Sequence, residues 1–120
     1  MEKLDERTYK FALRIVKLVN ALPQNKVGDV LGHQVLRSGT SVGANLEEAF
    51  AASTKREFTR IVTIAQREAK ETHYWLRLIR DSALIPGKQI EAIVQEALEI
   101  KLILAQTVIT SKKSKTKNQP

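Results

Sequence analysis

The sequence predicts an all-α fold in which four helices pack as an up-down-up-down bundle. Apolar residues recur at spacings of three and four along most of the chain, which is the period of an amphipathic helix. No segment shows the alternation of polar and apolar residues that is typical of a half-buried strand. The connections between the helical segments are short, which favours antiparallel neighbours in a bundle.

Composition limits the class of protein. The chain has 120 residues and no cysteine, so it fits one domain without disulfides or thiolate metal ligands. No secretory leader opens the chain, and no apolar run has the length of a membrane span. We therefore expect a cytoplasmic protein that does not enter a membrane. The net charge is +7, and the last ten residues carry four lysines and no acid. We expect a helical domain over residues 1–110 and a basic, disordered tail over residues 111–120.

The first helix is expected over about residues 5–22, with Asp5 as the N-cap and Pro23 after its end. Its apolar stripe has the width needed for a bundle core. A second stripe on the same helix consists of five cations, again spaced by three or four: Lys3, Arg7, Lys10, Arg14 and Lys17. Glu6 precedes Lys10 by four residues and is placed to pair with it.

The second helix is expected from Asn25, as its cap, to about Ala52. It contains the stretch RSGTSVGANLEEA, residues 37–49. Glycines weaken intrinsic helix propensity, so a helix here implies that the small side chains let other backbones approach closely. Five polar residues of the stretch form a candidate structural motif: Arg37, Ser38, Ser41, Asn45 and Glu48. We expect Asn45 on the core face, where a buried amide would set the register between helices.

Thr54 and Glu57 form a capping box that starts the third helix, which is expected to end near Asp81. One face of this helix is apolar. Another face carries cations with a tyrosine among them: Arg56, Arg60, Arg67, Lys70, Tyr74 and Arg77. Pro86 suits the start of a fourth helix. Around residues 100–105 that helix is apolar on nearly all sides, which indicates a subunit interface.

Two motifs carry a resemblance to a known family. The first is Arg37-Ser38, Ser41-Val42 and Asn45-Leu46-Glu47-Glu48, and the second is Lys55–Phe58 followed by IAQREAKETHYWL, residues 64–76. Together they resemble the bacterial proteins encoded in intervening sequences of 23S ribosomal RNA genes, over about residues 9–109. The chain departs from the family pattern at Leu36, Gly43 and Ala49, where a basic residue, a proline and a glycine are frequent.

The resemblance implies a left-handed four-helix bundle that assembles as a ring, typically a homopentamer. It also implies a similarity to the pentameric basic accessory protein of diversity-generating retroelements, which works with a reverse transcriptase and nucleic acid. It implies no established catalytic activity. We accordingly expect no cofactor, no metal and no catalytic residues.

Three functional hypotheses remain open. In the leading one, the basic faces of the first and third helices bind RNA or DNA phosphates, with Tyr74 or Trp75 available for base stacking. The alternative is a protein-interaction scaffold without nucleic-acid contact. The third is a metal-independent ribonuclease that uses Arg67 and His73. A di-metal carboxylate site is disfavoured, because no Glu-x-x-His motif occurs.

Overall fold

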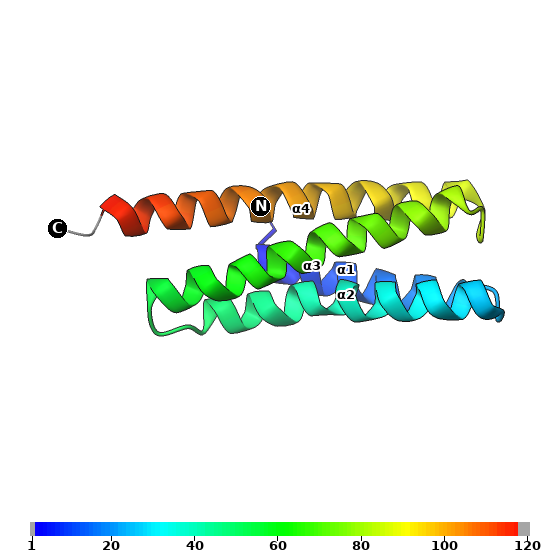
Figure 1. The fold of residues 1–120 in the computed structure, drawn as a ribbon, viewed down its shortest axis with the longest axis horizontal. Coiled ribbons are helices and arrows are strands. Elements are labelled where there is room, and N and C mark those ends of the chain that lie inside the picture. The colour runs from blue at the N-terminus through cyan, green and yellow to red at the C-terminus, as the bar shows by residue number, and fades with distance from the viewer. Residues whose placement is uncertain (1, 118–120) are drawn as a thin grey trace.

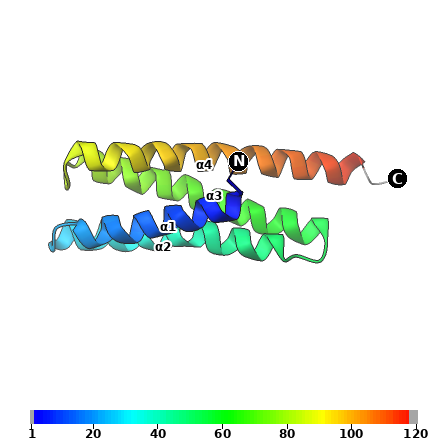
Figure 2. The ribbon, with the colours of Figure 1, turned by 180° about the vertical axis from the view of Figure 1, so that it is seen from behind.

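The computed structural model describes the backbone of residues 2–117 and the side chains of residues 2–113. Within this part of the chain there are four helices and no strand: α1 (Leu4–Ala21), α2 (Lys26–Phe50), α3 (Lys55–Asp81) and α4 (Gly87–Lys117). The helices run side by side along one long axis (Figures 1 and 2). Each packs on its chain neighbour, α4 closes against α1, and α1 and α3 lie on a diagonal. The all-α prediction of four helices is confirmed.

The ends of the helices agree with most of the sequence signals. Asn25 Oδ1 accepts a hydrogen bond from the backbone N–H of Gly28 at 2.8 Å, so it caps α2 as predicted. Thr54 Oγ1 accepts from the backbone N–H of Glu57 at 3.1 Å and caps α3. The Glu57 carboxylate binds the Arg60 guanidinium, so the reciprocal half of the predicted capping box is replaced by an ion pair.

The prediction that Asp5 caps α1 is wrong. The helix begins one residue earlier, at Leu4, and Lys3 occupies the N-cap position without a side-chain hydrogen bond. Leu4 packs against the hydrophobic core, which favours the earlier start. Asp5 lies in the first turn, where its Oδ1 accepts from the N–H of Glu6 at 3.0 Å. A carboxylate in the first turn still interacts favourably with the helix dipole.

The glycines of α2 form the surface on which α1 packs. A Cβ atom added to Gly39 would lie 2.9 Å from Cγ1 of Ile15, and one added to Gly43 would lie 3.3 Å from Oγ1 of Thr8. Ile15 and Thr8 are fully buried. The close approach of another helix to the small-residue stretch, predicted from the sequence, is therefore confirmed, and the approaching helix is α1.

The predicted domain boundary at residue 110 does not coincide with a helix end. The backbone of α4 continues as a helix to Lys117, seven residues further, and only residues 118–120 of the predicted tail lie outside the described part of the chain. Neither glycine nor proline occurs between Thr110 and Lys117. Lysines near a helix C-terminus also complement its dipole.

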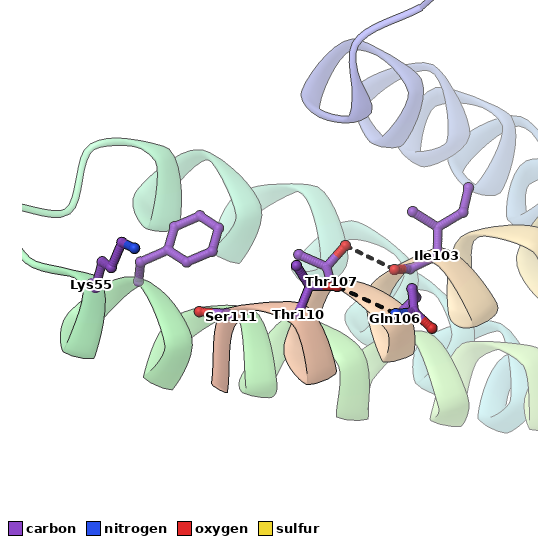
Figure 3. Close-up of a pocket in the computed structure, with 7 residues that line it drawn as sticks. Lys55, Ile103, Gln106, Thr107, Thr110 and Ser111 are labelled. Atoms are coloured by element: carbon purple, nitrogen blue, oxygen red, sulfur yellow. Dashed lines mark hydrogen bonds between the residues drawn. The ribbon is translucent and has the colours of Figure 1, made fainter. Parts of the chain in front are cut away.

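One end of the bundle is covered by three helices, because α1 has 18 residues and α4 has 31. In Figures 1 and 2 α1 begins near the middle of α4, and α4 continues past that point toward the end of the bundle that holds the α2–α3 connection. This end holds an open groove of about 500 Å³ lined by Lys55, Phe58, Ile103, Gln106, Thr107, Thr110 and Ser111 (Figure 3).

The groove at this end, which we call the apolar groove, has a largely apolar surface. Thr107 donates to the carbonyl of Ile103 at 2.8 Å and Gln106 donates to Thr110 at 3.3 Å, so these polar groups are satisfied within α4 (Figure 3). Leu102 and Ile109 of α4 are also about half exposed, while Ile100 and Leu104 are buried in the core. The predicted excess of apolar surface on α4 is thus present. None of the described helices is both long and apolar enough to span a membrane.

Candidate nucleic-acid interface

The cationic stripe of α3 lines a groove at the seam with α4. This basic groove has a volume of about 530 Å³, and its walls include Thr54, Arg56, Glu57, Thr59, Arg60, Thr63, Ile64, Arg67 and Lys112. The lining of the basic groove thus includes four cations, three of them predicted arginines, and one acid, Glu57. Lys112 was missed by the sequence reasoning, because it was assigned to a disordered tail. The absence of a helix breaker after Thr110 was the signal that could have placed it on α4.

The one acid that lines the basic groove, Glu57, pairs with Arg60. Arg60 donates to Glu57 through Nε at 3.2 Å and Nη2 at 2.5 Å. That hydrogen bonding raises the pKa of Arg60 and lowers the pKa of Glu57. Both side chains remain open to solvent, with 61% and 45% of their surfaces exposed. Arg56 and Arg67 are exposed as well, so the groove presents a net positive surface.

The same face of α3 continues into a cationic and aromatic surface. Lys70 and Arg77 are exposed, and the Arg77 guanidinium lies 5.9 Å from the centre of the Tyr74 ring. Tyr74 is 48% exposed. Trp75 is partly buried against the core and its Nε1 donates to Glu71 at 3.2 Å. Of the two aromatic residues proposed for base stacking, Tyr74 is therefore the one with an open ring.

The cationic stripe of α1 is different, because intramolecular ion pairs occupy part of it. Arg7 Nη2 lies 2.7 Å from Glu96 and 2.8 Å from Glu99, both on α4. These contacts raise the pKa of Arg7, mainly through the hydrogen bond to Glu96. Arg7 thus joins α1 to α4, because the helix seam brings two carboxylates to it. Its predicted contact with nucleic acid stays a prediction.

The remaining cations of α1 lie on the surface. Lys10 pairs with Glu2, which raises the pKa of Lys10. Lys3 is exposed, and Arg14 and Lys17 line a shallow pocket at the α1–α4 seam. Because α1 and α3 are diagonal in the bundle, their outward faces point in different directions. The two predicted stripes therefore do not form one surface within a single chain.

The two sequence motifs meet across the α2–α3 interface. Arg37 bridges Glu68, at 3.3 Å, and Glu71. The next residue, Ser38, hydrogen-bonds Thr72 at 2.9 Å in a fully buried contact. Arg37 and Ser38, the first two residues of the structural motif, thus attach α2 to α3. These contacts support a structural role for the motif.

The rest of the structural motif makes local contacts. Ser41 donates to the carbonyl of Arg37 at 2.8 Å, and Asn45 Nδ2 donates to the carbonyl of Ser41 at 2.9 Å. Asn45 is half-buried, so its predicted place in the core is wrong. Its amide reaches the carbonyl four residues earlier on its own helix, and this hydrogen bond sets no register between helices. Glu48 is exposed.

The geometry does not assemble the proposed ribonuclease pair. Arg67 is exposed in the basic groove, whereas His73 is 8% exposed. Six residues on one helix also separate the two side chains by about 120° around the axis. Nδ1 of His73 is buried and has no hydrogen-bond partner in the described chain. Residues 2–117 contain no group of three His, Cys, Asp or Glu side chains placed to hold a metal ion.

Comparisons with known proteins place the chain in a family. The model of the 23S rRNA-intervening sequence protein family matches residues 3–106. A crystal structure of a protein of unknown function from the S23 ribosomal protein family of Bacteroides thetaiotaomicron is similar, with 37% identity and a TM-score of 0.81. The match covers 88% of this chain and 98% of that one. No match is found among curated proteins. This chain therefore belongs to the family of 23S rRNA-intervening sequence proteins.

Proposed function

We propose that this protein is a non-enzymatic, oligomeric accessory protein that binds RNA or DNA through the basic face of α3. The observation that carries the proposal is the basic groove between α3 and α4, where Arg56, Arg60, Arg67 and Lys112 share a wall with one carboxylate. Guanidinium groups match the geometry of phosphate oxygens, and a cationic surface gains affinity by releasing counterions from a nucleic acid. The cations of α1 are a secondary surface.

Self-association is the second part of this proposal. Apolar side chains of α4 and the apolar groove stay exposed when the single chain is folded. Such exposed apolar surface is typical of a subunit interface. We propose that these left-handed bundles close into a homopentameric ring in the cytoplasm. A ring repeats one weak basic groove several times, and this multivalency increases the affinity for a long strand. The mass of the protein in solution tests this part, and a monomer at micromolar concentration would contradict it.

Nucleic-acid binding is tested by titrating labelled RNA and DNA at several salt concentrations. We expect binding at low salt that weakens steeply as salt rises. The double variant R60E/R67E should remove most of it. R14E/K17E, on α1, reverses the same number of charges at exposed positions outside the basic groove and should have a smaller effect. Absence of binding at low salt, or binding that R60E/R67E leaves unchanged, would overturn the proposal.

The alternative function is a scaffold that binds protein alone, and the apolar groove is the observation that favours it. A groove with 36% exposed Ile103 and a half-buried Phe58 suits an apolar helix face. R60E/R67E separates the two functions, because it should remove nucleic-acid binding and leave a protein contact at the apolar groove intact. Ile103→Glu should disrupt that protein contact and, because the apolar groove is also part of the proposed ring interface, self-association as well.

A further inference from the structure

The exposed ring of Tyr74 bears on whether the α3 face fits single-stranded or double-stranded nucleic acid. An exposed tyrosine is not unusual alone, and Tyr9 on α1 is 58% exposed. The surroundings of the two rings differ. Tyr9 lines a pocket with Asp5, Glu6, Lys10 and Glu47, in which acids outnumber cations. Tyr74 has Arg77 against its ring and lies on the helix face that carries Arg67 and Lys70.

The α3 face combines a phosphate-binding groove with an aromatic platform. At about 1.5 Å per residue, the rise along the helix from Arg67 to Tyr74 is about 10 Å, and that from Arg56 to Arg77 is about 32 Å. A chain of several nucleotides can therefore contact both the basic groove and Tyr74. Trp75 packs edge-on against Tyr74, with ring centres 5.1 Å apart.

An aromatic ring on such a face distinguishes unpaired from paired strands. In a duplex both faces of each internal base are stacked on neighbouring bases, so the ring finds no open base there. In a single strand the bases can stack on an aromatic side chain, while a cationic groove follows the phosphates. The pairing of Arg77 with Tyr74 adds a cation beside the stacked base.

We propose that the α3 face binds an unpaired polynucleotide strand, with its phosphates in the basic groove and one base stacked on Tyr74. This inference rests on the proposed function and narrows its ligand to single-stranded nucleic acid. Tyr74 acts by stacking on a base, and its hydroxyl is not required. RNA and DNA share this chemistry, since the contacts named are to phosphates and to the face of a base.

The test compares ligands of one sequence, about 12 nucleotides long, as single-stranded RNA, single-stranded DNA and duplex DNA. We expect the full chain to bind either single strand more tightly than the duplex. Tyr74→Ala should weaken single-strand binding about tenfold. Tyr74→Phe should retain it, and Tyr9→Ala, the matched exposed tyrosine, should leave it unchanged. Tyr74 is on the surface, so circular dichroism should show that each variant folds.

The outcomes separate this inference from the proposed function. Equal or tighter binding of the duplex, or single-strand binding that is unchanged in Tyr74→Ala but lost in R60E/R67E, would overturn the inference and leave nucleic-acid binding intact. No binding of any of the three ligands would overturn both.

Discussion

The hydroxyl groups of Ser38 and Thr72 lie 2.9 Å apart in the buried interface between α2 and α3. Thr72 Oγ1 is also 2.7 Å from the carbonyl of Glu68, one turn earlier on α3. Both side chains are fully buried, so the contact is shielded from water. It joins the two segments that carry the family resemblance, residues 37–48 on α2 and residues 64–76 on α3.

We predict that Ser38→Ala lowers the free energy of unfolding by about 1 kcal/mol, because it removes one buried hydrogen bond. Thr72→Val should cost a similar amount or more. The double variant should be less destabilised than the sum of the single variants by about 1 kcal/mol, which urea unfolding can measure as a double-mutant cycle. Additive effects would contradict the coupling. Thr40→Val, at a half-buried hydroxyl bonded within α2, is the control and should change stability little.

The packing of α1 on the glycines of α2 gives a second prediction. Gly39→Ala places a methyl group 2.9 Å from the fully buried Ile15 side chain, so we expect destabilisation by about 1–2 kcal/mol despite the better helix propensity of alanine. Gly87→Ala is the matched control, because nothing lies within 4 Å of its added Cβ. Thermal unfolding should leave Gly87→Ala at or above the wild-type midpoint. A stable Gly39→Ala would contradict the close packing.

Local signals in the sequence account for most of the fold. The polar caps Asn25 and Thr54 start α2 and α3 where predicted, since each bond joins residues three apart. The predicted cap at Asp5 is wrong, because α1 begins at Leu4, which packs against the core. The glycine-rich stretch was assigned to a helix correctly, yet its partner helix α1 could be identified only from the packed structure.

The candidate site was less accessible to sequence reasoning, because its contacts are distant in the chain. Arg7 meets Glu96, 89 residues later, and no local pattern distinguishes it from the other cations of its stripe. Lys112 lines the same groove as Arg56 only because α4 continues past residue 110. The regular spacing of cations in the sequence thus predicts the basic face of α3. It cannot show which cations of α1 form ion pairs with carboxylates.

The Arg7 contacts give a third prediction. The α1–α4 seam is the least extensive helix contact in the bundle, so its ion pairs should matter more than those elsewhere on the surface. We predict that Arg7→Ala lowers the free energy of unfolding by about 1 kcal/mol, and that added salt reduces the difference. Arg14→Ala, at an exposed position of the same helix, should change stability by less than about 0.5 kcal/mol.

The same contacts predict a change in acid stability. Arg7, and to a lesser extent Gln95, lower the pKa of Glu99 below its ordinary value of 4.5. The stabilisation is therefore present above pH 4.5 and is lost as the pH falls through the lower pKa of the folded state. Arg7→Ala should weaken the loss of stability on acidification in this range. Parallel pH profiles for the variant and the wild type would contradict the assignment.

His73 gives the last prediction, on stability near neutral pH. Burial, followed by the positive charges of Lys101, Arg77 and Arg80, lowers the pKa of His73 below its ordinary value of 6.5. Below pH 6.5 the unfolded chain therefore takes up a proton that the folded chain resists, and the free energy of unfolding falls, by at most about 1.4 kcal/mol per pH unit. His73→Leu should flatten this dependence below pH 6.5 in denaturant titrations. His33→Gln, at an exposed position on α2, is the matched control and should keep the wild-type profile. Equal slopes for His73→Leu and the wild type would show that His73 takes up its proton as readily in the folded state.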